Sequence, residues 1–142
     1  LWAGEHGFWL YANEGDHFAP HKLDGPRIWA QHIALGDFDN DGDGDVFVAS
    51  ADRNLFYEND GGVLTYKPAN SLGLAKTGLT AHWGDFDNDG LLDIYVAPSG
   101  LYRQTSDHHF SLTPVVLTPC DGCKSARSAW FDADNDGFLD AI

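Results

Sequence analysis

Three short loops of this 142-residue chain concentrate carboxylate side chains at a fixed spacing. They read DFDNDGDGD at 37–45, DFDNDGLLD at 85–93 and DADNDGFLD at 132–140, so each follows the pattern D-x-D-x-D-G-x-x-D. Carboxylates this close would repel one another without a counter-ion, whereas many oxygen ligands suit a hard divalent cation, Ca²⁺ above all. The loops therefore predict metal-dependent folding, with about three bound Ca²⁺ ions, one for each loop.

The acidic loops also dominate the charge of the chain. They hold thirteen of its 22 Asp and Glu residues, and the formal net charge is −14. Such a charge repels phosphate backbones and anionic membranes, and no Lys/Arg cluster offsets it, which argues against nucleic-acid binding. The sequence has no apolar run near the roughly 20 residues that span a bilayer, so membrane insertion is not expected. Solvated acidic hairpins without a metal remain the plain alternative.

The loops recur at a regular interval, which is the mark of a structural repeat. Asp37 and Asp85 are 48 positions apart, and Asp85 and Asp132 are 47 apart. Flanking segments repeat as well: VFVA at 46–49 matches IYVA at 94–97, and FWLYANEG at 8–15 matches NLFYENDG at 54–61. A period of this size is typical of propellers, solenoids and other arrays.

The segments around the loops predict strands. An EF-hand needs flanking helices and a bidentate Glu at loop position 12, but Val48 and Val96 stand there. The flanks are short and rich in β-branched and aromatic residues. The expected strands cover 28–37, 45–50, 54–58 and 64–68, then 79–85, 93–97, 100–104 and 108–112. Four short strands per repeat describe a propeller blade, with the acidic loop as the hairpin between its first two strands.

The expected fold is therefore all-β, a partial β-propeller of four-stranded blades with about three repeats and Ca²⁺-binding hairpin loops. The repeat units cover about 1–26, 27–70, 71–118 and 119–142, and the first and last are incomplete. A propeller closes with roughly four to eight blades. The chain is thus expected to be a fragment of a single propeller domain, whose remaining blades would be its neighbours.

These motifs resemble a known family. The phrases LFYENDG at 55–61 and AHWGDFDNDGLLDIYVA at 81–97 look like the FG-GAP/VCBS repeats of integrin-α-like β-propellers, and the cartilage acidic protein and bacterial ASPIC/UnbV group is the most similar. The resemblance implies that side chains at loop positions 1, 3, 5 and 9 and the carbonyl at position 7 bind Ca²⁺. The implied ligands are Asp37, Asp39, Asp41, Asp43 (carbonyl) and Asp45; Asp85, Asp87, Asp89, Leu91 (carbonyl) and Asp93; and Asp132, Asp134, Asp136, Phe138 (carbonyl) and Asp140.

Each loop also carries a glycine at its sixth position, which is expected to form a tight turn that a β-carbon would obstruct. The third copy departs from the other two, since Phe131 replaces the glycine found at 36 and 84, and Ala133 replaces the phenylalanine found at 38 and 86. Its carboxylates are intact, so the departure concerns packing more than metal binding.

Other reactive side chains carry weaker signals. Cys120 and Cys123 are expected to form a small disulfide, with free thiols as the alternative. The seven histidines lie in no catalytic or zinc motif, so surface or structural roles are expected. Trp83 and Trp130 occupy equivalent positions before a loop and are expected to pack between blades, whereas Trp9 or Trp29 could stack on a sugar ring.

The resemblance implies a calcium-binding module for adhesion or recognition, with structural Ca²⁺ and with a protein or glycan as ligand. Such a module is expected to be secreted or displayed on the cell surface, with the periplasm as an alternative, and not to be an enzyme. The main alternative is the propeller of a carbohydrate-active protein, either a lectin module or a polysaccharide lyase. Fold alone does not choose between these functions.

Overall fold

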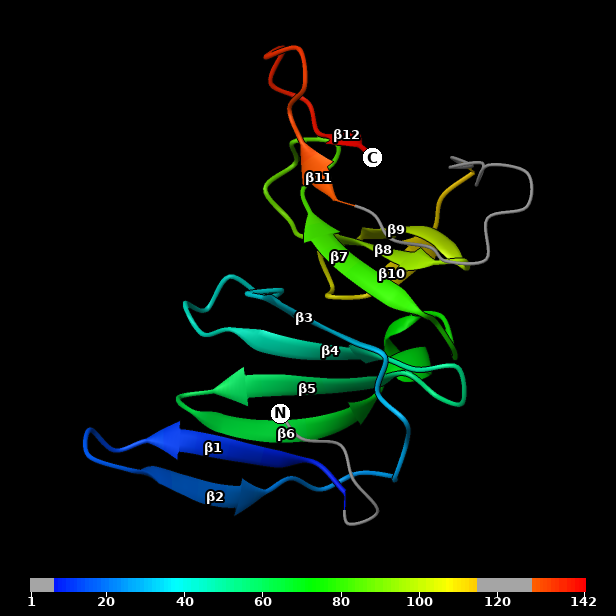
Figure 1. The fold of residues 1–142 in the computed structure, drawn as a ribbon. Coiled ribbons are helices and arrows are strands. Elements are labelled where there is room, and N and C mark those ends of the chain that lie inside the picture. Colours follow the sequence, from blue (N-terminus) through cyan, green and yellow to red (C-terminus); the bar gives the residue numbers. More distant parts are fainter. Residues whose placement is uncertain (1–6, 115–128) are drawn as a thin grey trace.

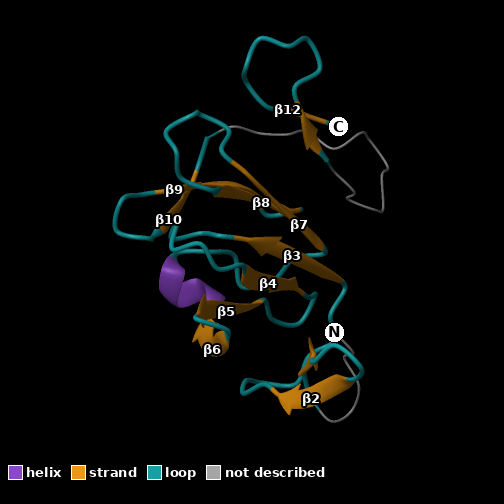
Figure 2. Cartoon of the chain, turned by 90° about the vertical axis from the view of Figure 1, so that its left-hand side faces the viewer, coloured by secondary structure: helices purple, strands orange, loops and turns teal. Residues whose placement is uncertain are grey.

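The computed structural model describes residues 7–114 and 129–142, and strands make up most of their regular structure. Two four-stranded antiparallel sheets and two short hairpins follow one another along the chain (Figure 1). The one helical element within these ranges is the 3₁₀ helix η1 (Ala69–Leu72), which connects the two large sheets (Figure 2). None of the described helices is long and apolar enough to cross a bilayer. The predicted all-β fold is confirmed.

Each large sheet is one propeller blade, with its strands in sequence order. The first blade consists of β3 (His32–Gly36), β4 (Asp45–Ala49), β5 (Leu55–Asp60) and β6 (Val63–Pro68). The second consists of β7 (Thr80–Gly84), β8 (Asp93–Ala97), β9 (Gly100–Gln104) and β10 (Phe110–Leu112). The short hairpins are β1 (Trp9–Asn13) with β2 (Phe18–Lys22), and β11 (Trp130–Phe131) with β12 (Asp140–Ala141).

The expected strands are confirmed with small shifts at their ends. The largest shift is in β3, which begins at His32 instead of residue 28. The preceding residues lead from the β1–β2 hairpin to the blade, and Ile28 and Ala30 pack against buried residues of the first blade on the way. Their apolar character reflects this packing and not membership of the β-ladder.

The first blade is covered on both faces because apolar residues occupy both faces of its central strand. Along β4, Val46 and Val48 join a buried cluster with Phe8, while Phe47 and Ala49 face the second blade. Every residue of β4 is buried. The sequence of a strand that is buried on both faces is a continuous apolar run, and residues 46–49 show this pattern.

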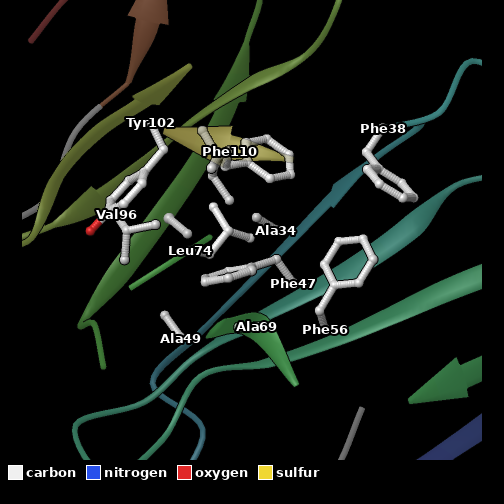
Figure 3. Packing of buried hydrophobic residues seen from close by; sticks show 12 residues of the cluster. Ala34, Phe38, Phe47, Ala49, Phe56, Ala69, Leu74, Val96, Tyr102 and Phe110 are labelled. Carbon is white, nitrogen blue, oxygen red and sulfur yellow. The ribbon is translucent and has the colours of Figure 1, made fainter. Parts of the chain in front are cut away.

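The main core lies between the two complete blades. Figure 3 shows Phe38, Phe47 and Phe56 of the first blade facing Tyr102 and Phe110 of the second. The ring of Trp83 on β7 also reaches this layer, edge-on to Phe47 and Phe56 with centroids 6.4 Å apart in each case. The predicted role of Trp83 in packing between blades is confirmed.

A glycine makes room for this tryptophan. A β-carbon on Gly36 would lie 2.8 Å from Cγ of Trp83, which is closer than packed atoms approach. Gly84 has the same relation to the next repeat, where its β-carbon would lie 3.3 Å from Cδ1 of Trp130. Trp130 also stands edge-on to Tyr95, so its predicted role in packing between repeats is confirmed as well. The glycine and tryptophan of successive repeats therefore form one recurring contact.

Candidate metal sites

The three acidic loops occupy the same place in successive repeats. In the first two blades, Gly36 pairs with Asp45 and Gly84 with Asp93, so each loop closes the hairpin between the first two strands. The third loop closes the β11–β12 hairpin in the same way, with Phe131 opposite Asp140. The predicted position of the loops within the blades is confirmed, and Figure 1 shows them projecting as three successive turns.

The first Asp of each loop holds the turn together. Its two carboxylate oxygens accept hydrogen bonds of 2.9–3.1 Å from the backbone N–H groups of loop positions 5 and 6. The glycine at position 6 has φ of 96°, 87° and 90° at residues 42, 90 and 137, in the left-handed region that favours glycine. The same turn is therefore built three times, as the repeated glycine predicted.

Within each loop, three carboxylates converge. The groups are Asp37, Asp39 and Asp41; Asp85, Asp87 and Asp93; and Asp132, Asp134 and Asp136, and in each of them one oxygen per residue lies within 4.8 Å of the others. This spacing allows a single cation to be held by all three side chains. Loop positions 1 and 3 belong to every group, whereas the third member is position 5 in two loops and position 9 in the second.

The Asp at position 9 is buried in both complete blades and anchors the loop to the sheet. Asp45 accepts hydrogen bonds from the N–H groups of Phe38 and Asn59, at 2.9 and 2.8 Å. Asp93 accepts equivalent bonds from Phe86 and Gln104. Burial raises the pKa of Asp93 to about 6, because desolvation penalises its charged form more than these hydrogen bonds favour it. Burial raises the pKa of Asp45 as well.

The remaining predicted ligands lie on the same loops. At position 7, the N–H groups of Asp43, Leu91 and Phe138 donate to the Asp at position 5, at 2.8–3.0 Å. The backbone of this residue is thus tied to a side chain within the loop, and the binding role of its carbonyl stays a prediction. Asp140 differs from Asp45 and Asp93, since it is exposed, although it too accepts a bond from the loop, from Ala133 N–H at 2.8 Å.

A direct sign of fit to a cation comes from two buried oxygens without a partner. They are Oδ1 of Asp39 and Oδ1 of Asp87, at position 3 of the first and second loops. Burial and the nearby charge of Asp41 also raise the pKa of Asp39. A buried carboxylate oxygen with no donor is costly unless a positive group compensates it, and at Asp87 the Arg103 guanidinium contacts only the other oxygen, Oδ2. The oxygen-rich loops therefore fit a hard cation at these positions.

Neighbouring loops are linked by hydrogen bonds that the sequence analysis missed. Nδ2 of Asn40 donates to the Gly90 carbonyl at 3.1 Å, and Nδ2 of Asn88 donates to the Gly137 carbonyl at 2.8 Å. The signal was present in the repeated Asn at position 4, but its partner lies about fifty residues away. Gln104 adds a buried link, since its N–H binds Asp93 and its Nε2 donates to the Phe38 carbonyl at 2.7 Å.

One histidine lies beside an acidic loop, since the ring of His108 stands edge-on to Phe38 with centroids 5.5 Å apart. His32 and His82 have ring centroids 4.9 Å apart in a groove of about 410 Å³ beside β3 and β7. Burial, aided by His32, lowers the pKa of His82 and favours its neutral form. His17 contacts Asp16 and Glu14 on the exposed β1–β2 hairpin. Cys120 and Cys123 lie outside the described residues.

Comparison with known proteins agrees with the repeat structure. The family described as FG-GAP-like repeat matches residues 1–48 and 37–96, which together include 96 of the 142 residues. The first two acidic loops lie within the matched range. No curated protein matches the chain, and no solved structure matches it either.

Proposed function

Because this chain belongs to the FG-GAP-like repeat family, we propose that it is a Ca²⁺-stabilised propeller module for extracellular adhesion or recognition. The ion has a structural role, and the blades present the surface that binds a protein or glycan ligand. The module is secreted or displayed on the cell surface, works without catalysis of its own and packs against the remaining blades of its propeller. Within the family, the phrase at 81–97 supports kinship with the cartilage acidic protein and ASPIC/UnbV group.

The observation that carries this proposal is the pair of buried, unpartnered oxygens at position 3 of the two complete loops. In each loop this oxygen belongs to a carboxylate that converges with two others. Carboxylates and carbonyls are the ligands that Ca²⁺ prefers, and its flexible coordination tolerates the different third member in each group. When bound, the ion would offset part of the negative charge of the loop and hold the hairpin closed.

The stabilisation expected from bound Ca²⁺ supports an extracellular setting. At a free Ca²⁺ concentration of about 1 mM and a dissociation constant of about 10 µM, each ion would stabilise the folded state by roughly 2.7 kcal/mol. Three such contributions are comparable to the stability of a whole domain, about 5–15 kcal/mol. The same sites would be largely empty where free Ca²⁺ is scarce, so the fold suits a calcium-rich compartment.

The first test is calorimetric titration of Ca²⁺ into chelator-stripped protein, paired with thermal melts with and without the ion. We expect about three binding sites and a large rise in melting temperature. Asp39→Asn should remove one site, whereas the control Asp52→Asn, which deletes the same charge from an exposed position between β4 and β5, should keep all of them. Absence of binding at millimolar Ca²⁺ would refute the structural role of the ion.

A propeller of a carbohydrate-active protein is the second candidate, and one side chain favours it. Trp29 is 73% exposed, and exposed tryptophans stack on sugar rings. Binding on a glycan array that disappears in Trp29→Ala would support a lectin role. Binding to protein partners that is unchanged in this variant would support the adhesion role instead.

A further inference from the structure

The two complete blades place opposite charges at one equivalent position beside their acidic loops. Glu58 lies on β5 and Arg103 lies on β9, each directly after a tyrosine. In both blades, this tyrosine pairs with the residue that follows the Asp at loop position 9. The next residues, Asn59 and Gln104, also match, because each donates its N–H to that Asp. Glu58 and Arg103 are therefore equivalent in the fold, although their charges are opposite.

The two side chains meet different partners. The Arg103 guanidinium reaches into the second loop, where Nε lies 2.6 Å from Oδ2 of Asp87 and Nη2 lies 2.9 Å from Oδ2 of Asp89. It thus bridges loop positions 3 and 5. Glu58 forms an ion pair with Lys67 of the neighbouring strand β6. In addition to burial and the charge of Asp41, the negative charge of Glu58 raises the pKa of Asp39 in the first loop, whereas His108 lowers it.

We propose that Arg103 is an internal competitor of the metal ion, so that the second loop binds Ca²⁺ more weakly than the first. The inference rests on the proposed Ca²⁺ role of the loops. Asp87 is one of the three converging carboxylates of the second loop, and Asp89 is a predicted ligand. A cation that binds both carboxylates must displace the guanidinium from them or share them with it. In the first loop, the equivalent residue adds negative charge instead.

Electrostatics sets the expected size of the effect. A unit positive charge about 6 Å from a divalent ion, in a water-like dielectric, changes the affinity by roughly tenfold. Salt reduces this effect, because Arg103 is exposed and its field is screened. An exposed ion pair contributes little to folding by itself. Loss of Arg103 should therefore change metal affinity far more than the stability of the metal-free fold.

The test requires a signal from each loop separately. The amides of Gly42, Gly90 and Gly137 serve this purpose, because each donates a hydrogen bond to the first Asp of its own loop. A Ca²⁺ titration of the ¹⁵N-labelled whole chain, followed by NMR, gives one midpoint per loop. In the unmodified protein, we expect the Gly90 signal to move at a higher Ca²⁺ concentration than the Gly42 signal.

Charge variants then test the cause. Arg103→Gln should lower the Gly90 midpoint by about tenfold and leave the Gly42 midpoint unchanged. Arg53→Gln is the matched control, since it removes the same charge from an exposed residue between β4 and β5, at the end of the first blade away from its acidic loop, and should move neither midpoint. If Arg103→Gln folds poorly, Arg103→Lys is the second variant, because lysine keeps the charge but lacks the planar group that contacts both Asp87 and Asp89. It should lower the Gly90 midpoint by a smaller factor.

Two results would overturn the inference, and they differ in what else they affect. A Gly90 midpoint that is unchanged in Arg103→Gln, wherever it lies relative to that of Gly42, would refute the competitor role and leave the Ca²⁺ function standing. A titration in which none of the three glycine signals moves would refute both.

Discussion

The central strands of the two complete blades, β4 and β8, share a sequence pattern but not the same surroundings. Both begin with a buried Asp and continue with apolar residues, and Phe47 and Tyr95 hold equivalent positions. All of β4 is buried, whereas Tyr95 on β8 is only partly covered. One face of the first blade packs against Phe8 and its neighbours, and the other face packs against the second blade. On β8, Tyr95 points away from the first blade and contacts Trp130. Burial in a repeat protein thus depends on the neighbouring repeat.

The largest expected effect tests this difference directly. Phe47→Ala should lower the free energy of unfolding by about 3–5 kcal/mol, because the ring is fully buried between two blades. Tyr95→Ala should cost about 1–2 kcal/mol, because less of its ring is covered. Urea unfolding in saturating Ca²⁺ measures both, and Phe47→Leu with Tyr95→Leu is a milder pair if the alanine variants fold poorly. Equal costs would contradict the dependence on neighbours.

A second contrast concerns the amide side chains after Glu58 and Arg103. Asn59 donates from Nδ2 to the Gly44 carbonyl in the loop of its own blade, at 3.1 Å, whereas the longer Gln104 reaches the Phe38 carbonyl of the preceding blade. Gln104→Ala should cost about 2 kcal/mol, since it leaves a buried carbonyl without a donor, and Asn59→Ala roughly half as much.

The same variants also show whether Gln104 couples the two loops. If it does, Gln104→Ala will shift the Ca²⁺ midpoints of both Gly42 and Gly90, while Asn59→Ala will shift that of Gly42 alone. A shift at Gly90 alone would mean that the link between blades carries no coupling.

The smallest expected effect is a dependence on pH. Burial raises the pKa of Asp93 from its ordinary value near 4 to about 6. Without metal, the folded state holds this proton more tightly than the unfolded chain does, so its stabilising contribution is present at low pH and is lost as pH rises through about 6. Metal binding needs the ionised carboxylate. The rise in melting temperature caused by Ca²⁺ should therefore be larger at pH 7.5 than at pH 5.

This comparison has an internal control, because other titrating groups such as His82 act in both the metal-free and the metal-bound protein. Their contributions largely cancel in the difference between the two melts. An equal rise in melting temperature at both pH values would show that Asp93 is ionised throughout this range in the metal-free fold.

Much of the fold could be predicted from the sequence because its signals are local. The period of 47–48 residues, the apolar runs at 46–49 and 94–97 and the turn-forming loops between strands predicted two blades and the hairpins that carry the acidic loops. The recurring Asp spacing also predicted which loops could hold a cation. The full set of fifteen ligands stays a prediction, since the converging groups include nine of these residues.

The sequence by itself determined the repeat, the strands and the acidic loops, because strand periodicity and turn chemistry act over a few neighbouring residues. Only the tertiary structure decided which oxygens converge, which of them remain without a partner, and which charge stands beside each loop. Those outcomes depend on side-chain length and on contacts between distant residues, such as Gln104 and Phe38, which are 66 positions apart. A pattern that repeats along the chain therefore predicts equivalent loops, while packing between blades makes them unequal.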